Sequence, residues 1–253
     1  CVKWTDGSSR NVLDRWRSVF SISTANGGAG RGGAATAVTI RIAMWSGPRN
    51  LSTAMMRSFG SRADTFVSDE PFYGCFLKQT GADHPMREEV FAAMDCDWTS
   101  VLSTLRGSPP DGSPVWYQKH MWHHMVGPVG YDDFEGFTHA FLIRRPEQMI
   151  ASYLRKREVA AFEDFGLERQ AEFFEREADR LGQAPPVIDA NDVLTDAASV
   201  LSKMCKGLSI PWDPEMLCWE PGRRETARDP PRKPRRASAR SWNVRDSAIN
   251  PPV

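Results

Sequence analysis

The sequence of 253 residues lacks an excess of charge of either sign, and it lacks long apolar runs. Its 32 lysines and arginines balance its 32 aspartates and glutamates, so the formal net charge is +0. A chain without a net positive field offers no general attraction for nucleic acid, and any anion site must therefore be local. No apolar run approaches the roughly 20 residues that span a bilayer. We therefore expect neither nucleic-acid binding nor a membrane span.

Cysteines are few, and none of them forms a C-x-x-C pair. The five are widely spaced, at Cys1, Cys75, Cys96, Cys205 and Cys218. An odd number without such a pair argues against a disulfide framework and against a zinc ribbon. This usage is typical of a reducing compartment, so we expect a cytoplasmic protein with inert thiols.

Both ends of the sequence lack the periodicity of packed elements. Residues 1–37 contain a glycine-rich run over 27–35 and are predicted to form a disordered leader. Arginines and serines in this leader also fit an organelle transit peptide, so organellar targeting is an alternative. Residues 223–253 are basic and rich in proline, which blocks regular structure, and we expect a second disordered segment there. One folded domain is expected between them, over 38–222.

Between these ends, strand patterns alternate with helix patterns. β-branched and apolar residues predict strands over 38–45, 65–68, 115–119, 138–143 and 187–189. Helices are predicted over 51–59 (with a side-chain cap), 71–79, 87–95, 98–106, from Pro146 onward, over 162–181 (with Phe173, Phe174 and Leu181 facing inward) and over 197–208. Strands that alternate with helices build a mainly parallel β-sheet flanked by helices. The predicted fold class is therefore α/β.

The first predicted strand ends in a turn that has the chemistry of an anion site. The turn, Ser46-Gly47-Pro48-Arg49-Asn50, opens the next helix. The first N–H groups of a helix lack partners, and the helix dipole places partial positive charge there. One cation and three hydrogen-bonding side chains lie here, from Arg49, Asn50, Ser52 and Thr53. The set fits a phosphate or a sulfate, and a plain structural turn is the alternative.

Two common nucleotide motifs are absent from this turn. It has Gly47 but no following Gly-Lys, so it does not match the G-x-x-x-x-G-K-[ST] loop of nucleoside triphosphatases. It also lacks the G-x-G-x-x-G of dinucleotide-binding folds. Chemistry of the triphosphatase kind is therefore not expected.

Three segments, in order, resemble the sulfotransferase family. Residues 48–53, Pro-Arg-Asn-Leu-Ser-Thr, are similar to the P-[KR]-S-G-T-[ST] loop with which that family binds a 5′-phosphosulfate. The segment from Arg144 to Ser152, with Pro146 two places after the arginine, resembles the family's 3′-phosphate segment. Residues 187–194 are similar to its late strand and acidic turn. The resemblance covers about 38–222 and implies a P-loop NTPase-like three-layer sandwich.

The resemblance implies a donor, an acceptor class and a set of nucleotide ligands. The donor is PAPS (3′-phosphoadenosine 5′-phosphosulfate), and the acceptor is a hydroxyl or amine of a small molecule or carbohydrate. The implied nucleotide ligands are Pro48, Arg49, Asn50, Ser52, Thr53, Arg144 and Ser152. Arg49 is also implied to stabilise the charge that develops on the bridging oxygen. No acidic Walker-B-like ligand is evident, so no metal ion is expected.

Two residues are candidates for the base that takes the proton of the acceptor. Glu70 follows the second predicted strand and resembles the catalytic glutamate of several bacterial and carbohydrate sulfotransferases; burial beside Phe66 or Phe72 would have to raise its pKa. His120 is similar to the histidine of the Lys-Thr-His segment of the cytosolic enzymes, except that Lys119 directly precedes it here. A histidine titrates near neutrality without tuning. The sequence favours Glu70 and leaves His120 open.

Other aromatic and histidine residues have two interpretations each. His120, His123 and His124 have the i, i+3, i+4 spacing that places metal ligands on one face of a helix, but no acidic or cysteine partner lies nearby, so we expect no zinc. Four aromatic residues are candidates for an acceptor pocket, with core packing as the favoured role; they are Trp116, Trp122, Tyr131 and Phe134.

Two departures from the family pattern leave alternatives open. Leu51 occupies a position where the family often has glycine, which lets the backbone approach a phosphate closely. The family's closing C-terminal segment has no clear counterpart, although Arg223 and Arg224 are candidates. The alternatives to a sulfotransferase are a catalytically inactive nucleotide-binding or interaction module of the same fold and, less favoured, a P-loop kinase. The acceptor itself is not predicted, because variable loops build such pockets.

Overall fold

A parallel sheet forms the centre of the computed structural model, which describes residues 39–84, 86–155, 159–219 and 240–241. The five-stranded sheet has the order β2-β3-β1-β4-β5. Its strands are β1 (Ile40–Ser46), β2 (Thr65–Asp69), β3 (Val115–Met121), β4 (Thr138–Ile143) and β5 (Val187–Asp189). Each neighbouring pair is parallel. The predicted strands are therefore all present, and the α/β class is confirmed.

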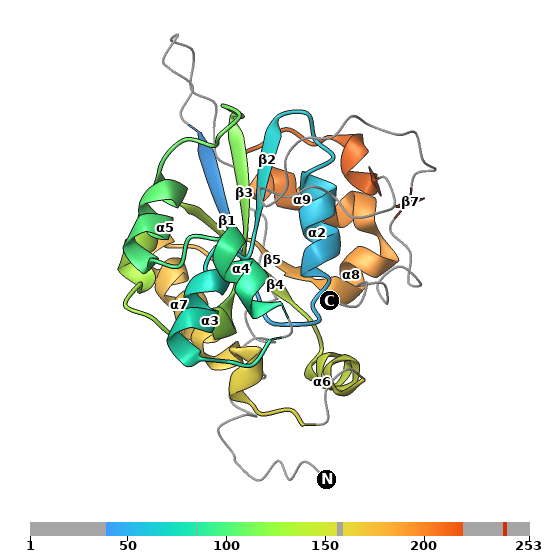
Figure 1. Ribbon diagram of the computed structural model, residues 1–253. Helices are drawn as coiled ribbons and strands as arrows, with labels where there is room; N and C mark the ends of the chain where they lie inside the picture. Colours follow the sequence, from blue (N-terminus) through green and yellow to red (C-terminus); the bar gives the residue numbers. More distant parts are fainter. Residues whose placement is uncertain (1–38, 85, 156–158, 220–239, 242–253) are drawn as a thin grey trace.

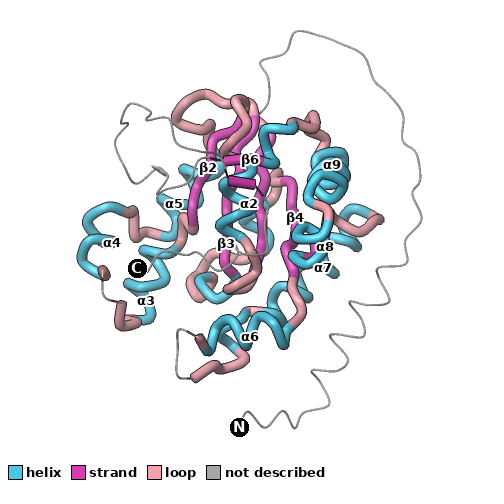
Figure 2. The backbone as a smooth tube through the Cα atoms, turned by 90° about the vertical axis from the view of Figure 1, so that its right-hand side faces the viewer, coloured by secondary structure: helices cyan, strands magenta, loops and turns pink. Residues whose placement is uncertain are grey.

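Helices cover both faces of the sheet, so the fold has three layers (Figure 1). One face carries α2 (Ser52–Phe59), α8 (Ala190–Thr195) and α9 (Ala197–Gly207); the other carries α3 (Tyr73–Thr80), α4 (Arg87–Ala93), α5 (Trp98–Arg106) and α7 (Leu167–Leu181). Figure 2 shows α6 (Pro146–Leu154) below the sheet. Among the described residues, 3₁₀ turns form parts of the connections, at η1 (Trp122–His124), η2 (Tyr131–Phe134), η3 (Glu163–Phe165) and η4 (Pro214–Leu217).

The two faces of β1 enter two separate hydrophobic cores. Ile42 and Met44 belong to the core beneath α2 and α9, together with Phe59. Ala43 and Trp45 belong to the core on the opposite face. Successive side chains of a strand point to opposite faces, so a strand covered on both sides needs a continuous apolar sequence. This requirement explains the apolar run of β1.

The predicted helix over 162–181 is divided at Gly166. This glycine has a φ of 61° between η3 and α7. A Cβ added at Gly166 would lie 2.5 Å from Cβ of Trp122, so a larger residue would collide with η1. Phe173 and Phe174 are buried as predicted, but the inward prediction for Leu181 is wrong, because it is 43% exposed. It is the last residue of α7, and the chain turns away from the helix directly after it.

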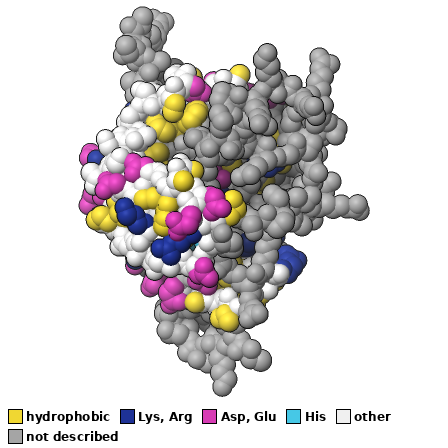
Figure 3. All heavy atoms as spheres, viewed as in Figure 1, with side chains coloured by type: hydrophobic (Ala, Val, Ile, Leu, Met, Phe, Trp, Pro, Cys, Tyr) yellow, Lys and Arg dark blue, Asp and Glu magenta, His cyan; other side chains and the backbone are white. Residues whose placement is uncertain are grey.

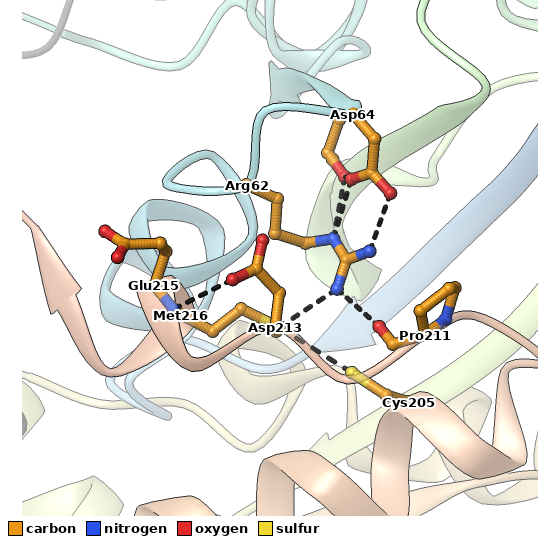
Figure 4. Close-up of polar contacts among 8 residues, drawn as sticks. Arg62, Asp64, Cys205, Pro211, Asp213, Glu215 and Met216 are labelled. Carbon is orange, nitrogen blue, oxygen red and sulfur yellow. Dashed lines mark hydrogen bonds and ion pairs between the residues drawn. The ribbon is translucent and has the colours of Figure 1, made fainter.

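A buried arginine joins the turn after α2 to the segment before η4. Nε and Nη2 of Arg62 donate to the two carboxylate oxygens of Asp64 at 2.9 and 2.7 Å, and Nη1 donates to the carbonyl oxygen of Pro211 at 2.7 Å. The side chain of Arg62 is 1% exposed. Figure 4 shows the guanidinium lying between Asp64 and Pro211. A buried charge is tolerated when it is paired and hydrogen-bonded, so this contact fixes two distant segments together.

Charges are mixed on the surface, and a short piece of the predicted tail forms a strand. Figure 3 shows acidic and basic side chains interspersed over the face that includes α3 to α5. Within the described ranges, no helix has the length and apolar character needed to cross a membrane. Of the segment predicted as a tail, Arg240–Ser241 forms β7, antiparallel to β6 (Cys218–Trp219). The rest of that tail, with Arg223 and Arg224, and the leader over 1–37 lie outside the described residues.

Candidate functional site

The carboxyl ends of β1 to β4 meet at one edge of the sheet, which faces α6 at the bottom of Figure 1. At this edge Ser46, the last residue of β1, pairs with Met121 of β3 and with Leu142 of β4. The chain runs from β1 to β2 and β3 on one side and then crosses to β4 on the other. In open α/β sheets, ligands bind outside the carboxyl ends of the strands where the strand order reverses. The predicted turn therefore lies where folds of this kind bind ligands, and this region at the strand ends is named the crevice below.

The turn between β1 and α2 contains two left-handed residues. Arg49 has a φ of 64° and Leu51 a φ of 62°. Leucine thus adopts at position 51 a conformation that glycine takes easily, at a cost of about 1–3 kcal/mol per residue. No side chain of the described residues caps α2, so the predicted cap is wrong. The first N–H groups of α2 are therefore left for another acceptor.

Gly47 and Asn50 hold this turn against η3 and β4. A Cβ added at Gly47 would lie 2.8 Å from the carbonyl oxygen of Phe165, which is too close for any other residue without movement. Nδ2 of the buried Asn50 donates to the carbonyl oxygen of Leu142 at 3.2 Å. Its Oδ1 is buried and has no donor among the described residues. The asparagine thus fixes the turn to β4.

Arg49, Arg144 and Ser152 form one hydrogen-bonded group. Nε of Arg49 donates to Oγ of Ser152 at 2.9 Å, and Nη1 of Arg144 donates to the carbonyl oxygen of Arg49 at 2.8 Å. Arg144 directly follows β4, and the buried Ser152 lies in α6, which begins at Pro146. The structure therefore brings together the two segments that the sequence predicts as ligands of one nucleotide.

This group, named the arginine group below, carries positive charge without a paired carboxylate. Neither Arg49 nor Arg144 belongs to an ion pair of the described residues. Burial and the charge of Arg155 lower the pKa of Arg49. Burial, Arg155 and Arg49 lower the pKa of Arg144, against an opposite effect of Asp189. Burial and like charges both disfavour the protonated form, and a bound anion would relieve both.

The remaining predicted ligands surround the start of α2. Ser52 and Thr53 are the first two residues of the helix, and Pro48 lies half-buried in the turn before it. Ser52 is buried, and Thr53 is half-buried. Their backbone positions place them next to Arg49 and to the helix N-terminus. The donor set of this region fits a ligand that carries phosphate or sulfate groups.

Glu70 directly follows β2 and is held by Lys119. Nζ of Lys119 lies 2.5 Å from Oε1 of Glu70 and 2.8 Å from Oδ1 of Asp69. Burial by itself would lower the pKa of Lys119, but the attraction of the two carboxylates outweighs it and raises that pKa. Glu70 has a φ of 48°, and its side chain is 24% exposed. A strained residue held by a fixed charge is a pattern of functional sites.

His124 is a neighbour of Glu70 that the sequence reasoning did not pair with it. Nδ1 of His124 lies 4.0 Å from Oε2 of Glu70, and its ring stacks on Phe76. The i, i+3, i+4 spacing brings three side chains to one face only in a helix. His120 instead lies in β3, whereas His123 and His124 lie in the 3₁₀ turn η1. Within the described part of the chain, no group of His, Cys, Asp and Glu has the arrangement of a metal site.

His120 lies in the aromatic core rather than at the crevice surface. It is 1% exposed and stacks on Trp45 with ring centroids 4.6 Å apart. Its Nε2 lies 3.2 Å from Oε1 of Gln118. Burial, together with His139, lowers the pKa of His120 to about 3. A histidine with this pKa is a weaker base than a free imidazole.

The comparisons with known proteins concern this same region of the chain. Residues 40–228 match the family model described as "Sulfotransferase domain". Among curated proteins, "Branched-chain-amino-acid aminotransferase-like protein 1" of Arabidopsis thaliana is 36% identical over 180 residues, and its counterpart, protein 2, is 33% identical over 179. Each alignment covers 70% of this chain but only 32% and 31% of the relatives. The chain therefore spans about a third of the length of these relatives.

Two solved structures align with part of this chain. A sulfotransferase from Alicyclobacillus acidocaldarius aligns at a TM-score of 0.48 and 12% identity, covering 71% of this chain and 88% of that one. The sulfotransferase domain of the Synechococcus PCC 7002 olefin synthase aligns at 0.44 and 13%, covering 75% and 80%. The family match starts at the first residue of β1 and includes both the turn of Arg49 and the segment of Arg144. On that match, this chain belongs to the sulfotransferase domain family.

Proposed function

We propose that this chain is a PAPS-dependent sulfotransferase that acts on a hydroxyl or amine of a small-molecule or carbohydrate acceptor. The observation that carries the proposal is the arginine group at the carboxyl edge of the sheet. PAPS has anionic groups on both its 3′ and 5′ positions. Two guanidinium groups and a helix N-terminus in one crevice match that charge distribution. Membership of the family supports the same assignment.

The nucleotide-binding residues divide between the two anionic ends of the donor. The first turn of α2, with Ser52 and Thr53, binds the 5′-phosphate, and Pro48 and Asn50 shape the turn. Arg144 and Ser152 bind the 3′-phosphate through charge-assisted and hydroxyl hydrogen bonds. Arg49 lies between these ends, because it contacts Ser152 on one side and belongs to the turn on the other. It neutralises the charge that develops on the bridging oxygen.

The transfer step needs one base and one leaving group. The acceptor oxygen or nitrogen forms a bond to sulfur, the bond from sulfur to the bridging oxygen breaks, and 3′,5′-ADP leaves. Glu70 takes the proton of the acceptor. Lys119 fixes Oε1 of Glu70, so the carboxylate stays oriented while the acceptor approaches. Sulfuryl transfer of this kind places no requirement for a metal ion on the residues named.

The names of the Arabidopsis relatives suggest amino-group transfer, and the site does not fit that chemistry. An aminotransferase that uses pyridoxal phosphate holds it as a Schiff base on a lysine amine. Lys119 is the buried lysine at this edge, and its ammonium group contacts Asp69 and Glu70. Its raised pKa keeps the amine protonated and therefore unreactive. We derive no amino-transfer step from these residues.

Thermal unfolding with different nucleotides tests the binding half of the proposal. The full chain is melted with 3′,5′-ADP, with 5′-AMP and with ATP and Mg²⁺. We expect 3′,5′-ADP to stabilise the protein by about 2.7 kcal/mol at 100 times its Kd, because a ligand of the native state shifts unfolding by mass action. Weaker stabilisation by 5′-AMP than by 3′,5′-ADP would show that the protein contacts the 3′-phosphate. Preference for ATP and Mg²⁺ would indicate a kinase instead.

A transfer assay tests the catalytic half. Radiolabelled PAPS is incubated with the protein and a panel of phenols, sugars and amines, and labelled products are separated by chromatography. A labelled product establishes the transferase. Tight binding of 3′,5′-ADP without any product across the panel would instead identify an inactive nucleotide-binding module of this fold.

A further inference from the structure

A cavity of about 260 Å³ lies beside the end of β1, on the face of the sheet opposite α2. Its walls include Trp45, Trp122, Tyr131 and Phe134, and Arg169 of α7 completes the lining on one side. None of the residues assigned above to the nucleotide or to proton transfer lines this cavity. It is therefore a second site, separate from the arginine group.

The walls of the cavity include aromatic rings, some nearly parallel and others at steep angles to each other. Trp122 stacks on Trp45 with ring centroids 4.2 Å apart, while Tyr131 meets Trp122 at 70° and Phe134 meets Trp45 at 82°. Aromatic rings prefer offset stacking or edge-to-face contact, and a planar guest finds both here. An apolar cavity of about 150 Å³ holds benzene. The larger volume here has room for a fused ring or for a ring with a short substituent.

The polar groups of the lining are donors. Trp122 is 2% exposed, and its indole N–H has no acceptor among the described residues. The exposed Arg169 donates from Nη1 to the carbonyl oxygen of Met125, another lining residue, and forms no ion pair within the described ranges. The lining contains no carboxylate.

Two carboxylates near the cavity already have partners. The Tyr131 hydroxyl donates to Oε2 of Glu172 at 3.1 Å, and Asp132 pairs with Arg176. An unpaired guanidinium and a buried N–H without an acceptor remain. The guanidinium, which has no carboxylate partner within the described ranges, favours a guest that carries an anionic oxygen.

We infer that this cavity is a binding site for a small aromatic acid. The ring packs among Trp122, Tyr131 and Phe134, and the carboxylate lies toward Arg169. The site adjoins the reaction crevice, because Trp122 and His124 belong to the same three-residue turn η1, and His124 faces Glu70. The acid is therefore either the acceptor of the transfer or a ligand that binds beside the crevice without being sulfated. Both sources share the same recognition chemistry.

Direct binding of naphthoate to the full chain tests this inference, with no nucleotide present. Titration calorimetry compares naphthoate with naphthalene methanol, which is neutral, and with cyclohexane carboxylate, which is not planar. We expect naphthoate to bind at least about tenfold more tightly than either analogue. Because the assay contains no sulfuryl donor, its outcome does not depend on the proposed transferase function.

Two variants with matched controls locate the site. Gly130 lines the cavity, its φ is −114°, and a Cβ there meets no atom within 4 Å, so Gly130→Leu is expected to fold and to fill the cavity. Glu135→Leu adds the same side chain to an exposed position of the same connection. Arg169→Gln removes the cation, and Arg87→Gln removes a half-buried arginine on α4 that does not line the cavity. Thermal melting verifies that each variant folds.

We expect Gly130→Leu and Arg169→Gln each to weaken naphthoate binding about tenfold or more, with both controls unchanged. Arg169→Gln should leave the affinity for naphthalene methanol as it is. Equal affinity of Gly130→Leu and the parent chain for naphthoate, or no saturable binding at millimolar ligand, would overturn the inference. Incubation of hydroxynaphthoate with PAPS then distinguishes the two sources, because only an acceptor yields a sulfated product.

Discussion

Nε of Arg49 donates a hydrogen bond to Oγ of Ser152 across 2.9 Å, although 103 positions separate the two residues in the chain. Arg49 belongs to the turn after β1, and Ser152 belongs to α6 after β4. Arg144 extends the contact by binding the carbonyl oxygen of Arg49. The two segments therefore meet in the folded chain.

Replacement of Arg144 by alanine tests the 3′-phosphate contact. Arg144→Ala should weaken 3′,5′-ADP binding by about 2 kcal/mol, roughly thirtyfold, because a charge-assisted hydrogen bond is lost. Titration calorimetry measures the change. Arg145→Ala is the matched control, since this arginine is adjacent in sequence and exposed. An unchanged Kd for Arg144→Ala, or an equal loss in the control, would count against the placement of the 3′-phosphate.

Glu70 and Asp69 share Lys119, so they form a matched pair for testing the base. Glu70→Gln should lower kcat about 10²- to 10⁴-fold with little change in nucleotide affinity, because the proton acceptor is removed. Asp69→Asn also removes one partner of Lys119 but should retain most of the activity. Steady-state kinetics with an acceptor from the panel provides the measurement. Similar losses in both variants would indicate that the pair acts only through Lys119.

The same kinetic assay tests whether His120 acts as the base. Its ring packs against Trp45, so phenylalanine preserves the shape of the site. We expect His120→Phe to keep kcat within a few-fold of the parent chain. If His120→Phe lost activity while Glu70→Gln retained it, the assignment of the base would reverse.

Buried histidines predict a loss of stability in mild acid. Burial, first of all, lowers the pKa of His120 to about 3 and that of His139 to about 4. Between these values and the unfolded value near 6.5, the unfolded chain binds more protons than the folded one. Stability present above pH ~6.5 is therefore lost as the pH falls toward 4, by up to about 1.4 kcal/mol per pH unit for each histidine.

Urea unfolding at a series of pH values measures this dependence. His120→Phe should reduce the change in unfolding free energy per pH unit by the contribution of one histidine. His84→Gln, at a half-buried loop position, serves as the control. An identical slope in His120→Phe and the parent chain would show that His120 does not carry the effect.

Loss of the Arg62 side chain should lower the stability of the fold without changing the residues of the candidate site. Arg62→Ala should destabilise the fold by about 3 kcal/mol, because it removes the charge-assisted hydrogen bonds of a buried guanidinium to the partly exposed Asp64 and to the carbonyl oxygen of Pro211. Arg106→Ala removes a pair that is exposed on both sides and should cost less than about 1 kcal/mol. Denaturant unfolding compares the two. A loss in Arg62→Ala no larger than in Arg106→Ala would refute the structural role.

Local pattern was sufficient for the order of the five parallel strands and for the location of the turn after β1, although it did not predict helix α8. β-branched runs such as that of β1 and turn residues such as Gly47 act over short distances, so the sequence alone determined where strands end and helices begin. The division at Gly166 and the exposure of Leu181 were not predicted, because both depend on what packs beside them: Trp122 in one case and the end of a helix in the other.

The contacts of the site were decided only by the tertiary structure. The sequence determined that Arg49, Glu70 and Arg144 follow strands, but parallel pairing is what brings those strand ends to one edge. Only the folded chain places Lys119 against Glu70, buries His120 in an aromatic core and forms the cavity that Trp122 and Arg169 line. These features depend on side chains that meet across the sheet, and such distances are not encoded in any local spacing.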